Sequence, residues 1–280
     1  MLSVIIPTCD RTELLTRCLE QLDGASEIVV SDDSRVFATR DLLVSRFPSV
    51  RWVQGPFRGP AANRNSGARA ATGEWLAFID DDCIPDKNWL SEIAKAISRA
   101  DVIEGKTVCP AKTNHLLEEV IENQTGGLLW SCNLAIRRDL FEQLGGFDED
   151  FLEAGGEDLE FAWRIKQKGL TVRFVPGAIV YHPARMLSLL ESVGRVFRMR
   201  WHLLYRLKTR STPSATLDEF LDLIRVTGRT VFFREHDWVM QRLFRLFLQW
   251  LLLPAWVPYL GYWEAKFRKD LSQQNALGYE

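Results

Sequence analysis

Paired cysteines are missing from this 280-residue chain. Its five cysteines are odd in number, and no two of them show CxxC spacing. The pattern argues against a disulfide framework or a zinc site built from spaced cysteines, and it predicts reduced thiols. No signal peptide precedes the first predicted strand, Leu2 to Ile6, so we expect a cytoplasmic protein.

A strong net charge and the common catalytic motifs are also missing. The chain carries 35 basic and 37 acidic side chains, a net charge of −2, which gives no reason to expect a nucleic-acid partner. It has no GxSxG elbow, no Walker loop and no GxGxxG fingerprint. Hydride transfer and covalent nucleophilic catalysis are therefore not indicated.

The sequence does contain an alternation of short apolar runs with helical patterns. The runs at residues 3–7, 27–30, 50–53 and 75–79 predict strands, and helical spacing lies between them. Two further short strands are predicted at 171–175 and 178–181. This alternation predicts an α/β fold with a mixed, mostly parallel sheet flanked by helices over residues 1–185, followed by a helical extension over 186–280.

The run Trp75 to Ile79 ends in three consecutive carboxylates, Asp80, Asp81 and Asp82. Unpaired carboxylates are very unfavourable inside a strand, so they must lie at its C-terminal end, where an open α/β sheet leaves a crevice for ligands. Three hard oxygen donors suit Mg²⁺ or Mn²⁺ and, through the metal, a diphosphate. The alternative is a solvated acidic turn.

Two positions before this run are candidates for nucleotide binding. Asp33 follows a predicted strand, where a carboxylate can accept hydrogen bonds from a base or a ribose, although it also suits a helix N-cap. Arg64 lies among alanine, asparagine, serine and glycine, which favours a guanidinium presented to an anion. An ordinary surface arginine is the alternative.

Three positions after the run are candidates for chemistry. Glu157 and Asp158 open a predicted helix, whose N-terminus favours ionised acids, so we expect Asp158 to be charged near neutral pH, as a general base requires. Acids that only stabilise the helix start are the alternative. His182 ends a strand before Pro183 and is either a metal ligand beside Asp82 or a structural histidine.

Taken together, these motifs resemble those of the family 2 glycosyltransferases, which have the GT-A fold. The resemblance extends over residues 3–183, about two thirds of the chain. The matching segments, in order, are 3–8 (SVIIPT), 30–34 (VSDDS), 63–67 (NRNSG), 71–74 (ATGE), 78–82 (FIDDD), 133–138 (NLAIRR), 145–148 (GGFD), 156–158 (GED) and 182–183 (HP). Cys9-Asp10 and Cys132 depart from the residues usual in the family.

The resemblance implies a role for each candidate. Residues 1–105 would form the nucleotide-sugar half and 106–185 the acceptor half of one catalytic domain. Asp158 would be the base, and Asp82, Asp80 and His182 would hold Mn²⁺ or Mg²⁺, with Asp82 as the direct ligand. The residues predicted to contact nucleotide or substrate are Pro7, Thr8, Asp33, Arg64, Asp80, Asp81, Asn133 and Glu157.

We therefore expect an inverting, metal-dependent transferase of the hexosyltransferase type. Its donor would be a nucleoside-diphosphate sugar, with UDP-sugars favoured, and its acceptor a hydroxyl of a glycan or lipid-linked glycan in cell-surface polysaccharide or glycolipid assembly. Two other interpretations stay open: a nucleotide-sugar-binding protein without transfer activity, and a metal-dependent nucleotidyltransferase.

The C-terminal third differs from the rest in charge. Residues 1–182 contain 20 basic and 28 acidic side chains, whereas residues 183–280 contain 15 and 9. The segment Leu246–Trp263 has 14 apolar residues in 18, interrupted by Pro254 and Pro258. Residues 243–263 thus predict contact with the cytoplasmic face of the inner membrane, without spanning it. Packing on the catalytic domain or a homodimer contact is the alternative.

Overall fold

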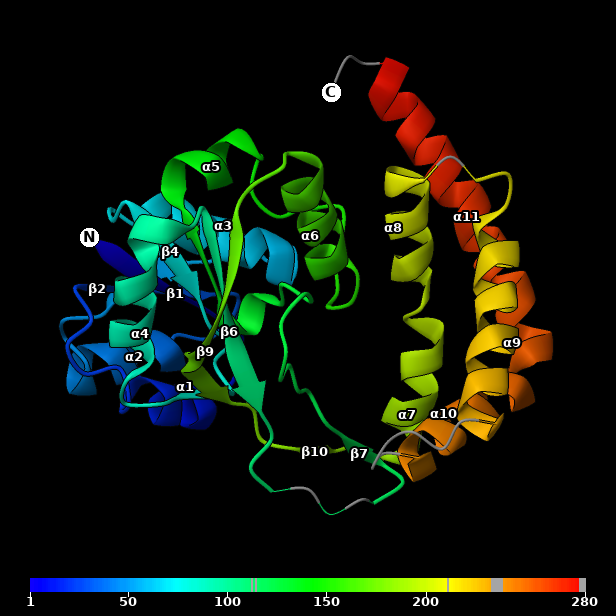
Figure 1. Cartoon of the computed structure of the whole chain (residues 1–280), viewed down its shortest axis with the longest axis horizontal. Helices are drawn as coiled ribbons and strands as arrows, with labels where there is room; N and C mark the ends of the chain where they lie inside the picture. Colours follow the sequence, from blue (N-terminus) through cyan, green and yellow to red (C-terminus); the bar gives the residue numbers. More distant parts are fainter. Residues whose placement is uncertain (112, 114, 211, 233–238, 277–280) are drawn as a thin grey trace. The chain divides into compact units, whose positions relative to one another are not determined.

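The structure, a computed structural model, describes residues 1–111, 113, 115–210, 212–232 and 239–276. It divides into two compact units. The first contains residues 1–111 and 120–183, and the second contains residues 112–119 and 184–280 (Figure 1). Each unit is described by itself below. The division of the first unit into a nucleotide-sugar half and an acceptor half stays a prediction.

The first unit follows the predicted alternation of strands and helices. Its elements, in chain order, are β1 (Leu2–Thr8), α1 (Thr12–Leu19), β2 (Glu27–Asp32), α2 (Ala38–Arg46), β3 (Arg51–Gln54), α3 (Pro60–Ala70), β4 (Trp75–Phe78), β5 (Ile84–Pro85), α4 (Trp89–Ala96), η1 (Ile97–Arg99), β6 (Val102–Val108), η2 (Ser131–Asn133), β8 (Leu134–Arg137), α5 (Arg138–Gln143), α6 (Glu157–Gln167) and β9 (Val172–Tyr181).

One eight-stranded sheet organises this unit, in the order β3-β2-β1-β4-β8-β6-β9-β5. The strands β3, β2, β1 and β4 are parallel to one another, β8 is antiparallel to both β4 and β6, and β9 is parallel to β6. Two reversals restore the original direction, so β1, β2, β4 and β9 all end at the same edge of the sheet. The predicted α/β class is confirmed.

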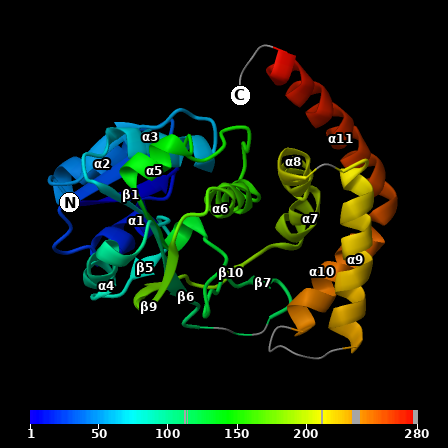
Figure 2. The same ribbon diagram turned by 45° about the horizontal axis from the view of Figure 1, so that its top comes forward.

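Two hydrophobic layers cover the two faces of the sheet. On one face α1, α2 and α4 pack through residues such as Leu15, Leu43 and Trp89. On the other, α3, α5 and α6 pack through a cluster that contains Phe141 and Phe161. Figure 2 separates α1 and α4 from α3, α5 and α6 across the strands. Alternate strand residues supply the two faces, since side-chain direction alternates along a strand.

The small residues of α3 let this helix approach the sheet closely. A Cβ atom on Gly67 would lie 2.7 Å from a methyl carbon of Ile5 in β1, so only glycine fits at this crossing. Asn63 donates a hydrogen bond to the carbonyl of Thr8 and accepts one from Ser31, which fixes α3 against the ends of β1 and β2. The helix is thereby positioned to carry Arg64 to the same edge.

The prediction of two separate strands near residue 176 was wrong, because β9 is continuous from Val172 to Tyr181. Its pairing with β6 shifts between Gly105 and Lys106, which face Val175 and Ile179. Residues 176–178 therefore bulge from the ladder, which accommodates a proline that cannot donate a ladder hydrogen bond.

The second unit is helical, as predicted for the C-terminal extension. A small two-stranded sheet joins β7 (Glu118–Glu119) to β10 (Arg185–Met186). The helices are α7 (Leu189–Phe197), α8 (Arg200–Thr209), α9 (Ala215–Phe232), α10 (Val239–Leu251) and α11 (Leu253–Ala276).

Buried charges hold the helices of this second unit together. Arg206 of α8 pairs with Glu219 at 2.5 Å, and it also pairs with Asp222; both acids belong to α9. Glu264 of α11 accepts hydrogen bonds from the backbone N–H groups of Ala215 and Thr216, and so caps the start of α9. Among the described residues, no helix is both long enough and apolar enough to cross a membrane.

Candidate active site

The predicted site residues converge because the strands that precede them end at one edge of the sheet. Thr8 ends β1, Asp33 follows β2, Asp80 to Asp82 follow β4, and His182 follows β9. These four strands run in the same direction, so the turns after them meet. Two clusters of charged side chains form there.

The first, which we name the open cluster, contains Arg11, Asp81, Asp82 and His182. The Arg11 Nη1 atom lies 3.1 Å from Oδ1 of Asp81 and 3.1 Å from Oδ2 of Asp82. Arg11 is half exposed, whereas Asp81 is buried and also accepts a 2.7 Å hydrogen bond from the Thr8 hydroxyl. Burial raises the pKa of Asp81 to about 7, although Arg11 and Thr8 act in the opposite direction.

His182 presents its Nε2 atom to Asp82. Nδ1 lies 3.1 Å from the carbonyl oxygen of Pro183, and a carbonyl can only accept, so Nδ1 carries the proton in this contact. Nε2 then offers a lone pair at 3.7 Å from Oδ1 of Asp82. A nitrogen and an oxygen lone pair that face one another in this way form a candidate metal position.

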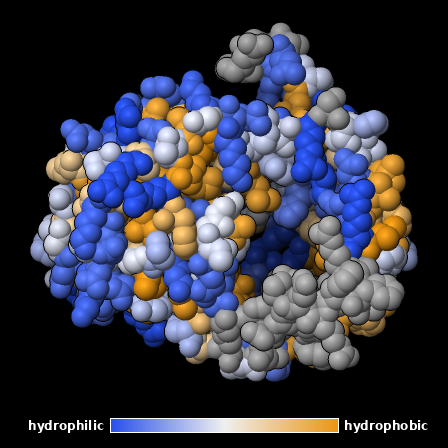
Figure 3. Space-filling view, viewed as in Figure 1, coloured by the Kyte–Doolittle hydropathy of each residue, from blue (hydrophilic) through white to orange (hydrophobic). Residues whose placement is uncertain are grey.

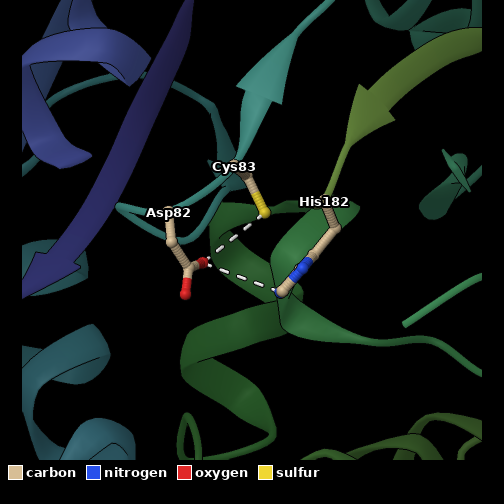
Figure 4. A group of neighbouring side chains, drawn as sticks. All are labelled: Asp82, Cys83 and His182. Atoms are coloured by element: carbon tan, nitrogen blue, oxygen red, sulfur yellow. Dashed lines mark hydrogen bonds and ion pairs between the residues drawn. The ribbon is translucent and has the colours of Figure 1, made fainter. Parts of the chain in front are cut away.

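A possible metal-ligand group is indeed found here. One ligand atom each from Asp82, Cys83 and His182 lies within 4.8 Å of the others, and Figure 4 shows the thiol and the ring turned toward one carboxylate oxygen of Asp82. Asp82 and His182 were predicted as ligands and fit a divalent cation. Asp80 does not join the group, because Arg64 holds its Oδ1 at 2.8 Å. For Asp80 the remaining prediction is that it supports the bound donor without contacting the metal directly.

The second, which we name the buried cluster, contains Arg64, Asp80, Glu157 and Asp158. Arg64 is 4% exposed, and its guanidinium binds Asp80 at 2.8 Å and Glu157 at 3.3 Å and lies over the ring of Phe147. Burial opposes the charge of Asp80, but Arg64 outweighs it and lowers the pKa of Asp80. The sequence predicted a guanidinium free to meet an anion; the structure instead engages it with two carboxylates.

Asp158 differs from its predicted state. Burial, followed by the neighbouring charge of Glu157, raises the pKa of Asp158 to about 7, although Arg64 lowers it. We expected Asp158 to be charged near neutral pH; with a pKa of about 7 its carboxyl is only partly ionised there, because burial outweighs the helix N-terminus. Oδ1 of Asp158, Oγ of Ser131 and Nε of Arg64 are buried atoms with no hydrogen-bond partner among the described residues. Buried polar atoms are normally paired, so these atoms have hydrogen-bonding capacity left over. Ser131 is near enough to lower the pKa of Asp158.

The nucleotide-side residues divide into supporting and accessible groups. Asp32 is buried and accepts hydrogen bonds from the Ser34 N–H and the Trp52 indole. Asp33 is partly exposed and accepts the Phe57 N–H at 2.9 Å; burial raises its pKa. Pro7 pairs with Ser31 inside the sheet. Nucleotide contacts by Pro7, Thr8 and Asp33 stay predictions.

Asn133 has a structural position. Its amide nitrogen donates to the carbonyl oxygens of Lys106 and Ala178, and its oxygen accepts the indole N–H of Trp89. Both amide hydrogens are therefore used inside the fold. The prediction that this side chain contacts substrate is corrected accordingly: it ties β6, β9 and α4 together beneath the site.

Two site residues were missed from the sequence, Arg11 and Cys83. A single arginine near the start of α1 and a single cysteine after three acids show no spacing that distinguishes them from surface or core residues. The adjacency of Cys83 to Asp82 was the one available signal, since neighbouring residues at a strand end can both reach a ligand.

Family models match most of the first unit. Residues 3–114 match the model of glycosyl transferase family 2, and residues 123–186 match the model described as the N-terminal domain of galactosyltransferase. A pre-mycofactocin glycosyltransferase from Mycobacterium tuberculosis is 28% identical over 204 residues, which covers 65% of this chain and 43% of the relative. The chain thus spans less than half the length of that relative.

Solved structures share the fold. A mannosyltransferase from Pyrobaculum calidifontis in complex with GDP-Man and Mn²⁺ aligns with a TM-score of 0.55 at 18% identity, covering 100% of this chain and 80% of the other. TarS from S. aureus in complex with UDP-GlcNAc aligns with a TM-score of 0.55 at 19% identity, covering 99% and 92%. At these identities the likeness shows the fold alone.

Proposed function

The chain belongs to the family 2 glycosyltransferases and has the GT-A fold, and on this premise we propose that it is an inverting, divalent-metal-dependent hexosyltransferase. Its donor is a nucleoside-diphosphate sugar, with UDP-sugars favoured. Its acceptor is a hydroxyl of a glycan or lipid-linked glycan in cell-surface assembly. Nucleotide-sugar donors also occupy two proteins of the same fold, one with UDP-GlcNAc and one with GDP-Man.

One observation carries the proposal: a possible cation site and a carboxylate with a raised pKa lie at the same edge of the sheet. Asp82 and His182 would hold Mn²⁺ or Mg²⁺, which when bound offsets the negative charge of a leaving diphosphate. Arg64 keeps Asp80 ionised beside them. The two clusters are electrostatically linked, because Asp80 raises the pKa of Asp158 and Arg11 of the open cluster lowers the pKa of Asp80.

Asp158 is suited to accept the acceptor's proton. Its Oδ1 is buried and has no partner among the described residues, so it can receive a hydrogen bond from a sugar hydroxyl. A pKa of about 7 places it near the value at which a general base is most effective at neutral pH. Attack by one hydroxyl, with one base and no covalent intermediate, inverts the anomeric centre.

The test measures nucleoside-diphosphate release from a panel of UDP- and GDP-sugars with Mn²⁺ or Mg²⁺. Asp158→Asn removes the base and is expected to lower the rate by about 10²- to 10⁴-fold. Asp23→Asn is the matched control, because Asp23 is an exposed acid at the end of the α1 region and its loss should leave the rate unchanged.

Three results would overturn the proposal. Donor binding without release would indicate a nucleotide-sugar-binding protein, and pyrophosphate release from a nucleoside triphosphate and a sugar phosphate would indicate a nucleotidyltransferase. Full activity of Asp158→Asn would exclude this residue as the base. NMR of the product anomer tests inversion.

We also propose that residues 243–263 of the second unit contact an anionic membrane surface. Phe247 and Leu251 of α10 and Tyr262 of α11 are more than half exposed, and apolar side chains are visible on the C-terminal helices (Figure 3). Lys266 and Lys269 are exposed just beyond this segment. Apolar side chains beside lysines favour the interface of an anionic bilayer.

Vesicle flotation tests this contact. The protein should float with vesicles that contain anionic lipid and stay at the bottom with neutral vesicles. The double variant Phe247→Ser, Leu251→Ser should lose flotation, whereas Val44→Ser, an exposed apolar residue of α2, should retain it. Equal flotation of the two variants would contradict the proposal, and a concentration-dependent dimer lost only in the double variant would assign the surface to self-association.

A further inference from the structure

Glu104 of β6 is a buried carboxylate that holds a turn distant from it in the sequence. Its two oxygens accept hydrogen bonds from the consecutive backbone N–H groups of residues 127–129 at 2.6–2.8 Å, and from the side-chain amide of Asn123 at 2.6 Å. These donors satisfy a carboxylate that would otherwise be very unfavourable in the core. One side chain of β6 therefore fixes the segment 123–129.

The bound turn has an unusual backbone. Gly126 and Gly127 have φ angles of +81° and +96°, which glycine adopts without strain. Leu129 has a φ of 56°, which is strained for a residue with a Cβ atom. Its side chain is buried, and its N–H donates to Glu104 at 2.6 Å. Burial of the leucine and the bond to the carboxylate together stabilise this strained conformation.

Ser131 lies between two attachments of this segment to β6. Before it, the N–H of Leu129 is bound by Glu104, and after it the side chain of Asn133 donates to the carbonyl of Lys106 at 3.0 Å. The backbone of Ser131 is thus held from both sides by one strand. The position of its hydroxyl is fixed accordingly.

The Ser131 hydroxyl lies beside the carboxyl group of Asp158. Oγ of Ser131 and Oδ1 of Asp158 are both buried, and neither has a hydrogen-bond partner among the described residues. Burial raises the pKa of Asp158, as do the charges of Glu157 and Asp80. Arg64 and the Ser131 hydroxyl lower it, as a donor to the ionised form does.

We propose that Glu104 is a positioning residue, which acts through the turn at residues 126–129 to hold the Ser131 hydroxyl beside the base Asp158. The inference rests on the proposed function, which assigns Asp158 as the base. The hydroxyl donates a hydrogen bond to the ionised carboxylate and leaves the other lone pairs of the carboxylate for the acceptor's hydroxyl. A larger fraction of Asp158 is then ionised at neutral pH, as proton abstraction requires.

The pKa of the Asp158 carboxyl tests the proposal without a nucleotide sugar. Carbon-13 NMR of the metal-free full chain measures it, and the resonance is assigned by its loss in Asp158→Asn. Ser131→Ala removes the donor and should raise the pKa by about one unit. Glu104→Gln keeps the volume of the side chain but weakens its hold on the turn, so it should raise the pKa by a smaller amount.

Two features separate positioning from a direct effect of charge. Loss of the negative charge of Glu104 would by itself lower the pKa of Asp158, so a rise has the opposite sign. In a Ser131→Ala background, Glu104→Gln should cause no further rise, because its effect passes through the hydroxyl. If Glu104→Gln does not fold, Asn123→Ala replaces it: this variant loosens the same turn, leaves Glu104 charged and should also raise the pKa.

The same shift has a kinetic signature. With Mn²⁺ and an active donor from the UDP- and GDP-sugar panel, Ser131→Ala should release nucleoside diphosphate about fivefold more slowly at pH 7, because a base whose pKa rises from about 7 to about 8 is mostly protonated there. The deficit should shrink to less than about twofold at pH 8.5. The KM for the donor should not change.

Glu118→Gln is the matched control. Glu118 is also a buried glutamate that holds a loop, since both its oxygens accept the N–H of Thr113 at 3.0 Å, but that loop does not contain Ser131. The pKa of Asp158 should not change in this variant.

Four results would overturn the proposal: an unchanged pKa in Ser131→Ala, an unchanged or lower pKa in Glu104→Gln, a rise from Glu104→Gln that persists in the Ser131→Ala background, or an equal rise in Glu118→Gln. The proposed function fails separately, since the NMR titration needs no donor and nucleoside-diphosphate release can be present or absent whatever its result.

Discussion

The open and buried clusters use the same residue types for different purposes. Each places one arginine between two carboxylates, yet the Arg11 side chain is 45% exposed and the Arg64 side chain 5%. An exposed guanidinium stays hydrated and can exchange with another cation, whereas a buried one is held by the carboxylates that neutralise it. The comparison indicates that Arg64 is a fixed part of the fold and that Arg11 is a replaceable charge at the candidate metal site.

The largest effect is expected when the buried arginine is neutralised. Arg64→Gln leaves Asp80 and Glu157 without their cation, and breaking a buried ion pair in this way typically lowers the free energy of unfolding by about 3–5 kcal/mol. Urea unfolding followed by circular dichroism measures the change. Arg64→Lys, which keeps the charge but not the two-sided contact, should lose less; equal losses would show that geometry rather than charge decides.

The second prediction concerns pH and the buried cluster. The pKa of Asp158 is raised from 3.8 to about 7, so between these values the folded protein holds a proton that the unfolded chain has released. The free energy of unfolding should therefore fall as pH rises from about 4 to about 7, with a slope of at most about 1.4 kcal/mol per pH unit from this group.

Asp158→Asn cannot ionise, so it should flatten this part of the curve. Asp81, whose pKa is also raised to about 7, adds a slope of the same sign that persists in the variant. Urea titrations of metal-free protein at several pH values measure both slopes. Parallel curves for parent and variant would show that Asp158 does not titrate in this range.

The sequence predicted β1 to β4 and the edge where they end, because these follow from local patterns of apolar and charged residues; it did not predict β8 and it divided β9 in two. Three acids after an apolar run were expected to leave the core, and parallel strands to bring their ends together. Asp82 is partly exposed, but Asp81 stays buried with Arg11 and Thr8 as its partners. The assignment of Asp82 and His182 to one position depended on this rule and on the family resemblance, and the structure brings the two side chains to 3.7 Å.

The local sequence pattern could not predict which charged side chains of the site are buried. The raised pKa of Asp158 depends first on its burial. The occupied guanidinium of Arg64 depends on Asp80 and Glu157, which lie 16 and 93 residues away in the sequence. The hydrogen bonds of the Asn133 side chain go to Lys106, Ala178 and Trp89, which are also distant in the sequence. Arg11 can be recognised only when the ends of β1 and β4 place it beside Asp82. Cys83 already adjoins Asp82 in the sequence, and the end of β9 brings His182 to the same place.

The third prediction tests whether Arg11 is a replaceable charge. Arg11→Gln removes a cation that repels a metal ion at Asp82, so Mn²⁺ should bind more tightly in the absence of donor. An exposed pair contributes about 0.2–1 kcal/mol, which limits the gain to about fivefold. Electron paramagnetic resonance of free Mn²⁺ measures the dissociation constant. Weaker binding in the variant would mean that Arg11 positions Asp82 for the metal instead of competing with it.

The smallest expected effect is the loss of stability in Arg11→Gln, which is measured as a free energy of unfolding, as it is for Arg64→Gln. Arg11→Gln should lower the free energy of unfolding by no more than about 1 kcal/mol, because its half-exposed guanidinium is hydrated in both states. Loss of this arginine also leaves Asp81 paired only with Thr8, and a carboxyl with a pKa near 7 can take up a proton there rather than stay charged. Urea unfolding at pH 6 and pH 8 separates the two contributions, since protonation relieves Asp81 at the lower pH. A loss as large as that of Arg64→Gln at both pH values would mean that exposure does not distinguish the two arginines.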